Sequence, residues 1–514
     1  MHTLGKTQLG GNTTRPVPAL LTDEQMRRFV TDGYLMLRPT VPEDTHGIID
    51  DKFNWIVEHE PNPGNNILPR LPELNLVLES PEVRGAMISL LGENYLIHPH
   101  RYWHYRAPDE ACPNDPEEVW ARVQANSHQD SYSPSRQPKC HYQRYARFMY
   151  YSHDVEEIHG PTHVIPGSQY HGALDDKDRA REIPVTGPAG TVFLSHFELG
   201  HAAGVNHSER VRHMIKFIFM RTEVPVGPTW ACRSTEWWQP TKRNAPFDLE
   251  PAWRHHWHWL CGRKGHSHDG ANADVPDLIS LLNTAGQADR TRAIYTLTDA
   301  GSAAVAPLID VLRKAGERES GLETPAFHRA TTVTMDDAAY ALATIGREAV
   351  APLIELLDTP HEWTRLNTVF TLGEIGPDAG AAVDRLEDLL HDPSHRVIRF
   401  AANALGNIGD AAAQKPLCDL LAKNLPEWDV PGDFGWPVGH LVHSNAAMAL
   451  ARLGAAAADS EADMIRHLYH PCGQVGAFLT EALRRIGTPT AIEAIVSDLS
   501  FRRWDASLHE KRQY

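Results

Sequence analysis

The sequence predicts a multidomain protein in which a β-rich N-terminal domain precedes an all-α solenoid. The prediction rests on three observations: a length of 514 residues, short apolar runs before residue 270, and a helical repeat after it. A chain of this length exceeds a single hydrophobic core. The composition, 42% hydrophobic and 22% charged, is typical of a globular protein with sizeable cores.

Charge and cysteine usage exclude several classes of protein. The net charge of −17 disfavours nucleic acid and anionic membrane as partners. No apolar run is long enough to span a bilayer, and the first twenty residues lack the apolar core of a signal peptide. The six cysteines are scattered without a CxxC pair, which is typical of reduced thiols and favours a cytoplasmic location.

Five short runs in the first half are rich in β-branched and aromatic residues, so we expect them to be strands. They are YLMLR (34–38), YLIHPHRYWHYR (95–106), RFMYYSHDV (147–155), GTVFLSH (190–196) and MIKFIFMRTEV (214–224). Few helices are expected in this half. One is predicted within residues 21–33, where Thr22 and Gln25 fit a capping box and Met26, Phe29 and Val30 form an apolar face.

After residue 270 a glycine recurs before a small-residue helix that ends in paired apolar residues. Most units are a little over thirty residues long, and the marker glycines are Gly301, Gly346, Gly376, Gly409, Gly454 and Gly487. Helical units of fixed period predict an α-solenoid. Two of them, LDTPHEWTRLNTVFTLGEIG and LHDPSHRVIRFAANALGNIG, resemble HEAT repeats of the short type. Two longer spacings contain insertions at 313–337 and 422–440, which we expect to be loops.

A connector rich in tryptophan and histidine joins the two halves. Residues 225–270 hold six of the thirteen tryptophans, together with five histidines that could suggest a metal cluster: His255, His256, His258, His266 and His268. Their spacing matches no metal geometry, so a packed aromatic connector is favoured. The expected organisation is an extension (1–20), the β-rich domain (21–224), the connector (225–270), the solenoid (271–500) and a tail (501–514).

The stretch NSHQDSYS contains His128 and Asp130, two residues apart. On a strand such residues point to the same side, and two histidines with one carboxylate form the facial triad of non-haem Fe(II) oxygenases. The third ligand would come from a later strand. The segment 190–220 offers His196, His201, His207 and His213, together with Arg210 and Arg212.

Residues 20–225 resemble the phytanoyl-CoA dioxygenase family of Fe(II)/2-oxoglutarate oxygenases in several motifs. These are the opening LTDEQMRRFVTDGYLMLRPTVP, HQD at the HxD position, HGPTHVIPGSQYHG with its Pro-Gly-Ser turn, and GTVFLSHFELGHAAGVNHSERVR. The resemblance implies a double-stranded β-helix (jelly-roll, cupin-like) domain with Fe(II) held by His128, Asp130 and His201. It also implies that Arg212 binds the far carboxylate of 2-oxoglutarate.

The resemblance leaves alternatives for the third metal ligand and for the residues that bind the cosubstrate. His196 is the competing third ligand, and Arg210 is the alternative to Arg212. Trp103, Tyr145 and Arg147 lie on strands expected to line the cavity, so they are candidates for the other end of the cosubstrate. Four arginines on or near these strands would suit an anionic substrate or form surface ion pairs: Arg101, Arg106, Arg144 and Arg147.

The resemblance implies catalysis in which 2-oxoglutarate and O2 are cosubstrates, succinate is formed, and a small-molecule substrate is oxidised. Halogenating relatives lack the carboxylate ligand, so Asp130 favours hydroxylation or a related desaturation or ring closure. The family accepts acyl-CoA thioesters, amino acids and secondary metabolites, so the substrate stays open. Secondary metabolism is one expected setting.

The solenoid allows two further readings. HEAT arrays usually bind proteins, so a protein partner or self-association is one expected role, and a scaffold with a vestigial oxygenase fold is the alternative function. A zinc hydrolase is disfavoured because the chain lacks HExxH. The aromatic connector, with Phe327, Trp428 and Trp436 in the insertions, instead favours a solenoid that packs on the oxygenase domain and shapes its substrate entrance.

Overall fold

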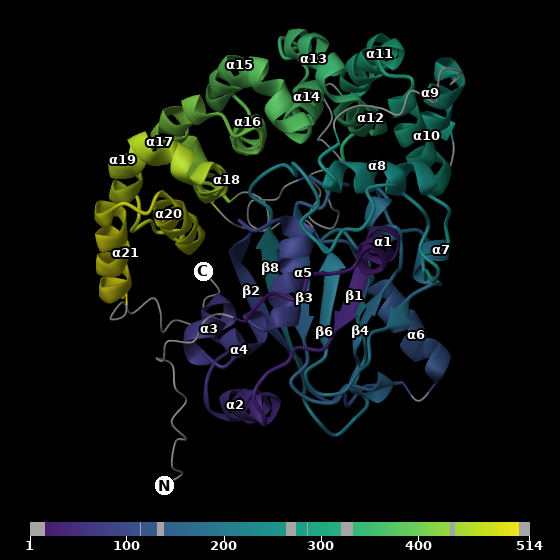
Figure 1. Cartoon of the computed structure of the whole chain (residues 1–514), viewed down its shortest axis with the longest axis vertical. Helices are drawn as coiled ribbons and strands as arrows, with labels where there is room; N and C mark the ends of the chain where they lie inside the picture. The colour runs from purple at the N-terminus through teal and green to yellow at the C-terminus, as the bar shows by residue number, and fades with distance from the viewer. Residues whose placement is uncertain are drawn as a thin grey trace.

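The computed structural model describes residues 16–113, 115–130, 138–263, 274–284, 286–319, 333–431 and 437–502. Predictions for most of the two terminal segments, and for His266, His268, Phe327 and Trp436, lie outside the described residues. Figure 1 shows two parts: a β-rich N-terminal half, and an arc of helices that curves over one end of its sheets.

The strands form two antiparallel sheets, as expected of the β-rich domain. The larger sheet has the order β1-β6-β3-β8-β2, and its strands are β1 (Tyr34–Leu37), β2 (Leu96–Arg106), β3 (Tyr145–Tyr150), β6 (Val192–His196) and β8 (Arg212–Met220). The smaller sheet has the order β5-β4-β7, and its strands are β4 (Thr162–Val164), β5 (Ile183–Pro184) and β7 (His201–Ala203).

The two faces of the larger sheet have different partners. The inner face packs toward the smaller sheet through a compact cluster that includes Tyr34, Met149, Met214 and Val164. The outer face is covered by helices, and Phe53 of α2 (Thr45–His59) stacks on Trp103 of β2 with ring centroids 4.6 Å apart. Because side chains alternate along a strand, this arrangement decides which residues can reach the space between the sheets.

Helix α1 (Asp23–Asp32) has the predicted capping box, in which Thr22 and Gln25 each bond the other's backbone N–H. The expectation of few helices in this half is wrong. The helices between α1 and the solenoid are α2, α3 (Ile67–Arg70), α4 (Leu74–Leu78), α5 (Pro81–Leu91), α6 (Pro116–Ala125), α7 (Asp176–Arg179) and α8 (Glu250–Leu260). The spacing of Ile49, Phe53 and Ile56 gives α2 a buried face, which the strand-focused prediction overlooked.

The second half is the predicted solenoid of paired helices. They are α9 (Val275–Thr284), α10 (Gln287–Asp299), α11 (Ser302–Glu319), α12 (Asp337–Ile345), α13 (Val350–Leu356), α14 (Glu362–Ile375), α15 (Val383–Asp388), α16 (His395–Ile408), α17 (Gln414–Ala422), α18 (Val438–Leu453), α19 (Glu461–Arg466), α20 (Gly473–Ile486) and α21 (Pro489–Arg502). The even-numbered helices from α10 to α20 line the concave side of the arc (Figure 1). All six marker glycines have positive φ, from 54° to 80°, a conformation that glycine adopts readily where a helix ends.

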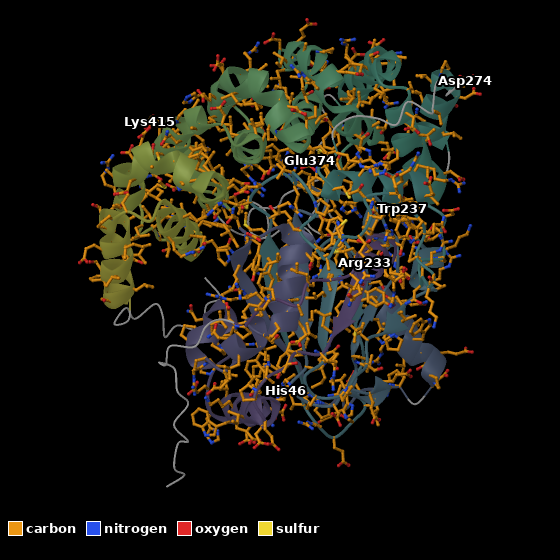
Figure 2. The ribbon with its side chains drawn as sticks, viewed as in Figure 1. His46, Arg233, Trp237, Asp274, Glu374 and Lys415 are labelled. Carbon is orange, nitrogen blue, oxygen red and sulfur yellow. The ribbon has the colours of Figure 1, made fainter. Side chains whose placement is uncertain are left out.

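The solenoid packs directly on the β-rich domain along a surface that we call the seam. Its centre is the buried segment 138–144. The Lys139 N–H donates to the Val333 carbonyl (2.7 Å), and the Tyr340 hydroxyl donates to the Lys139 carbonyl (2.9 Å). The Arg144 Nε lies 2.9 Å from Glu374 Oε1; Glu374 lies on the solenoid near the β-rich domain in Figure 2.

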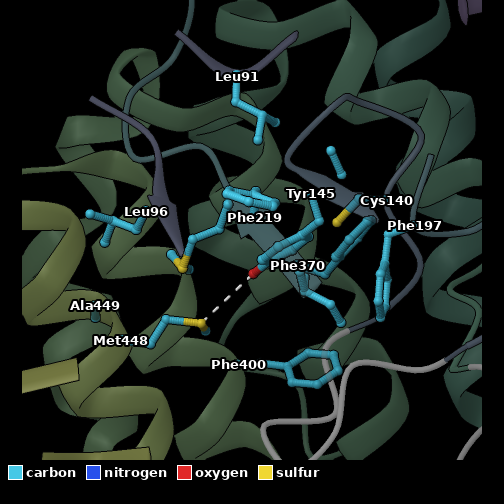
Figure 3. Packing of buried hydrophobic residues seen from close by; sticks show 14 of the residues in the cluster. Leu91, Leu96, Cys140, Tyr145, Phe197, Phe219, Phe370, Phe400, Met448 and Ala449 are labelled. Atoms are coloured by element: carbon cyan, nitrogen blue, oxygen red, sulfur yellow. Dashed lines mark hydrogen bonds between the residues drawn. The ribbon is translucent and has the colours of Figure 1, made fainter. Parts of the chain in front are cut away.

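Aromatic and sulfur-containing side chains fill the seam from both sides. Phe197 and Tyr145 of the β-rich domain and Phe370, Phe400 and Met448 of the solenoid belong to one buried cluster (Figure 3). The Tyr145 hydroxyl accepts a hydrogen bond from Arg452 Nη2 at 2.5 Å. The predicted docking of the solenoid on the β-rich domain is therefore what the structure shows.

The connector is also packed. Trp253 and Trp257 of α8 are fully buried, and the Trp257 ring lies 5.0 Å from that of Trp230. His255 bonds the Tyr142 hydroxyl and His256 that of Tyr170, so both serve packing. None of the described helices is both long and apolar enough to cross a membrane.

Candidate metal centre

His128, Asp130 and His201 meet between the two sheets. His128 forms an isolated antiparallel bridge with His201, the first residue of β7, and each donates its backbone N–H to the other's carbonyl at 2.9 Å. One ligand atom from each of the three side chains lies within 4.8 Å of the others. Within the described ranges, no other group of three histidine, cysteine or acidic side chains has ligand atoms this close.

Backbone carbonyls orient both imidazoles. His128 Nδ1 lies 2.8 Å from the Asn126 carbonyl, and His201 Nδ1 lies 3.1 Å from the Leu199 carbonyl. Because a carbonyl only accepts, His128 Nδ1 carries the proton and its Nε2 keeps the lone pair. His201 Nδ1 also lies 3.3 Å from Arg147 Nη1, a donor, so the carbonyl and the guanidinium together fix this ring with its Nε2 toward Asp130. The His128 Nε2 lies 3.7 Å from Asp130 Oδ1, and the His201 Nε2 lies 3.8 Å from Oδ2.

The electrostatics of Asp130 and His201 suit metal ligands. Burial alone would raise the pKa of Asp130, but Lys216, Arg147 and the two histidines outweigh it and hold that pKa well below the usual range. Burial, followed by the charge of Arg147, lowers the pKa of His201 well below its usual range. The carboxylate is therefore ionised and the His201 imidazole neutral at physiological pH, the forms that bind a divalent cation.

Arg147 of β3 holds the carboxylate. Its Nη2 donates to Asp130 Oδ2 and to the Phe197 carbonyl, both at 2.7 Å, and its side chain is fully buried. We predicted Arg147 as a cosubstrate-binding residue, and the structure places it against the metal-ligand candidate Asp130.

Tyr145 and Trp103, the other two residues predicted to line the cavity, lie away from the triad. Tyr145 bonds Arg452 in the seam, where burial raises the pKa of its hydroxyl to about 12. Trp103 lies on the outer face of the larger sheet, between Phe53 and His213. These placements leave Tyr145 and Trp103 outside the site that we propose below.

Arg212, at the start of β8, has the features expected of a carboxylate-binding residue. It is 1% exposed, and burial lowers its pKa. Its Nε donates to the Gly160 carbonyl at 3.2 Å, whereas its Nη1 has no hydrogen-bond partner in the described part of the chain. A buried guanidinium with an unused donor fits an anionic ligand such as the far carboxylate of 2-oxoglutarate. The alternative, Arg210, is paired with Asp50.

The competing histidines serve other contacts. His196 Nδ1 accepts from the backbone N–H of Glu198, and its ring lies near that of His256. His207 contacts the Cys112 thiol, and His213 contacts the Asn54 amide on the outer face. None of them belongs to the metal-ligand group among the described residues.

Lys216 of β8 is the residue that the sequence prediction missed. Its Nζ lies 3.8 Å from Asp130 Oδ2, and only 12% of its side chain is exposed. Lys216 shares its strand face with Arg212, because their positions in the strand differ by an even number, four. A single lysine in the apolar run MIKFIFM was the signal available in the sequence.

Two hollows lie at different distances from the triad. The larger, about 1010 Å³, lies between the turns that end the inner solenoid helices and α8, and none of the triad residues lines it. The smaller, about 610 Å³, is lined by Asn126, whose carbonyl orients His128, and by Ala203, two residues after His201. None of the triad residues lines the smaller hollow either, so it adjoins the triad only through these two chain neighbours.

Comparison with known proteins agrees with this arrangement. Residues 29–214 match the model of the phytanoyl-CoA dioxygenase (PhyH) family, and residues 336–402 and 350–429 match HEAT repeats. No curated protein matches the chain.

Among solved structures, the chain is similar to the carbocyclase SnoK from nogalamycin biosynthesis, described as non-haem and α-ketoglutarate-dependent (17% identity, TM-score 0.31, 42% of this chain and 88% of that one). It is also similar to HygX from Streptomyces hygroscopicus with nickel and 2-oxoglutarate bound (16%, 0.30, 39% and 87%). A third is the non-haem monooxygenase ThoJ as a nickel complex (16%, 0.26, 40% and 83%). The family match confirms the resemblance predicted from the motifs: residues 29–214 are a phytanoyl-CoA dioxygenase family domain, which HEAT repeats follow in the same chain.

Proposed function

We propose that the protein is an Fe(II)- and 2-oxoglutarate-dependent dioxygenase that oxidises a small molecule. The family match and the His-Asp-His group support a non-haem iron oxygenase. The observation that carries the proposal is the orientation of the triad: both imidazoles have Nδ1 engaged by backbone carbonyls and Nε2 directed toward the Asp130 carboxylate. This donor set leaves coordination positions open on one side of a bound metal.

Iron, 2-oxoglutarate and O2 together supply the oxidising power when they are bound. The chain's own residues orient the reactants. Arg147 fixes Asp130 by bonding Oδ2 and is itself fixed by the Phe197 carbonyl. Arg212 pairs its unused Nη1 donor with the far carboxylate of 2-oxoglutarate. Retention of the Asp130 carboxylate favours hydroxylation, desaturation or ring closure over halogenation.

The solenoid has a structural role in this proposal. Residues 138–144 lie between Asp130 and Arg147 in the chain, and the solenoid binds this segment through Val333, Tyr340 and Glu374. The solenoid therefore holds the strand that carries Arg147, which in turn holds a metal ligand. In this role the solenoid supports a metal ligand, whereas the sequence predicted that it shapes the substrate entrance.

A protein partner is a second role that one observation favours. On α21, the last described helix, Ile492, Val496 and Leu499 are 43%, 52% and 58% exposed, at the spacing of one helix face. Such a face at the end of a HEAT array suits protein docking or self-association.

The proposal is tested with the full chain loaded anaerobically with Fe(II), by measuring bound iron and then succinate formation from 2-oxoglutarate in air across candidate substrates. His128→Ala, Asp130→Ala and His201→Ala should each lose iron binding and succinate formation while melting as the parent protein does. His196→Ala is the matched control, and it should keep bound iron. Activity in His201→Ala with loss in His196→Ala would move the third ligand to His196, and full activity in all variants would refute the site.

A further inference from the structure

Cations outnumber carboxylates beside the triad. Asp130 faces both Arg147, at 2.7 Å, and Lys216, at 3.8 Å. The nearby Glu198 faces a cation of its own, Lys139. A divalent metal would add positive charge that the dianionic cosubstrate only balances, so the excess of cations persists in the loaded site.

Most cations around the site already have partners. Arg147 bonds Asp130 and the Phe197 carbonyl. Arg101 Nε donates to the Asn65 carbonyl, and Arg144 is paired with Glu374 in the seam. These contacts remove three of the four arginines that the sequence offered for an anionic substrate.

Lys216 differs from these arginines. Its only contact with an acid is the 3.8 Å approach to Asp130 Oδ2, and no hydrogen bond to its ammonium is found within the part of the chain that the structure describes. An ammonium has three donors, and one approach of 3.8 Å to a carboxylate leaves them available to a ligand. The position therefore fits a ligand that supplies acceptors.

On its face of the sheet, Lys216 has polar neighbours on β2 and the apolar Met149 on β3. In the register of β2 and β8, Tyr102 pairs with Lys216, and His104 pairs with Met214 one step along. Directly paired residues project to the same side, so the side chains of Tyr102 and His104 lie on the same face of the sheet as that of Lys216. Arg212 lies four residues from Lys216 on this strand, roughly 13 Å apart along the backbone, so the two cations can serve separate anions.

We propose that Lys216 binds a carboxylate of the primary substrate, so that the dioxygenase oxidises an anionic small molecule. The inference rests on the proposed function. The same chemistry has a second source, because the metal-chelating carboxylate of 2-oxoglutarate could also reach Lys216. The test therefore measures the binding of 2-oxoglutarate separately from the binding of a carboxylate that stands in for the primary substrate.

The full chain is loaded with Co(II), whose visible absorption reports ligands at the metal, and 2-oxoglutarate is titrated in. Acetate and its neutral isostere acetamide are then titrated at constant ionic strength. Four proteins are compared with the parent: Lys216→Gln, Lys216→Arg, Arg212→Gln, and the control Lys415→Gln, whose lysine is exposed and paired with Asp419 on α17.

The parent should respond to acetate and not to acetamide. Lys216→Gln should bind acetate about tenfold more weakly, as expected for a lost charge-assisted contact, with 2-oxoglutarate affinity unchanged. Lys216→Arg should keep most of the acetate response, Arg212→Gln should lose 2-oxoglutarate affinity, and Lys415→Gln should match the parent.

Three results would overturn the inference: acetamide binding as well as acetate in the parent, an undiminished acetate response in Lys216→Gln, or a loss of 2-oxoglutarate affinity in Lys216→Gln like that of Arg212→Gln. The last result would assign Lys216 to the cosubstrate. If the parent binds no Co(II) or no 2-oxoglutarate, the proposed function itself fails, and the inference falls with it.

Discussion

The seam and the metal centre are both built from buried charged and aromatic side chains, and they differ in how their polar atoms are satisfied. In the seam, Arg144 pairs with Glu374 and Tyr145 accepts from Arg452. At the metal centre, two Nε2 atoms face a carboxylate, and Arg212 keeps an unused donor. Strand β3 serves both regions, with Tyr145 on the seam and Arg147 on the triad. The difference teaches that buried charge alone does not identify a functional site, whereas the convergence of three metal-ligand atoms within 4.8 Å does.

The largest effect should come from breaking the seam ion pair. Arg144 and Glu374 are nearly fully buried, so Glu374→Ala leaves a buried cation and should lower the free energy of unfolding by about 3–5 kcal/mol. Urea denaturation measures the loss. The exposed pair between Arg385 and Asp358 is the control, and Asp358→Ala should cost less than about 1 kcal/mol. Equal costs for the two variants would mean that the seam is no more than surface packing.

The next effect concerns the unused donor at the metal centre. Arg212→Met should weaken 2-oxoglutarate binding about 30- to 150-fold, because a charge-assisted pair contributes roughly 2–3 kcal/mol. Calorimetry on the Ni(II)-loaded protein gives the affinity directly. Arg210→Met is the matched control and should leave the affinity unchanged, since Arg210 pairs with Asp50. A loss in Arg210→Met instead would transfer the role to that residue.

Arg147 joins the two regions, and its removal should show as weaker metal binding. Without it, Asp130 loses its closest hydrogen-bond donor, so Arg147→Met should reduce metal affinity about 10- to 100-fold. Competition with a chromophoric chelator measures the change. Arg147→Lys keeps the charge but not the two-branched contact, and it should fall between the parent and Arg147→Met. Parent-like affinity in Arg147→Met would show that Asp130 needs no such support.

The smallest effect is expected for Tyr145→Phe. The change removes the acceptor for Arg452 Nη2 but keeps the ring in its cluster, so it should cost about 1–2 kcal/mol. Because Arg452 also donates to Asn403, part of its hydrogen bonding survives. Denaturation and metal titration together sharpen the comparison: stability should fall while metal affinity stays within about twofold. A larger fall in metal affinity than in Arg147→Met would place Tyr145 at the metal centre after all.

The sequence predicted the residues of the metal centre better than those of the seam. The residues of the metal centre are close together in the sequence, whereas residues that pair in the seam are far apart. His128 and Asp130 form a local pattern, and His201 and Arg212 follow in one continuous segment, so the site could be proposed from motifs. The partners in the seam are remote: 230 residues separate Arg144 from Glu374, and 307 separate Tyr145 from Arg452. No local pattern reports such pairs.

Strand parity explains the remaining misplacements. In RYWHYR, every second side chain faces the space between the sheets, but the sequence does not say which set does. The structure turns Trp103 toward α2, and Tyr102 and His104 toward Lys216. Counting forward from Arg212 in steps of two would have found Lys216, since both residues lie on β8.

The backbone bridge between His128 and His201 has a consequence for folding. The two residues are already joined by two backbone N–H···O hydrogen bonds of 2.9 Å. An ion between their imidazoles would therefore act as a removable cross-link between a loop and the edge strand β7. By mass action, metal at a hundred times its dissociation constant stabilises the folded chain by about 2.7 kcal/mol. If the triad binds iron as proposed, the resistance of this sheet edge to unfolding would therefore rise and fall with the supply of iron.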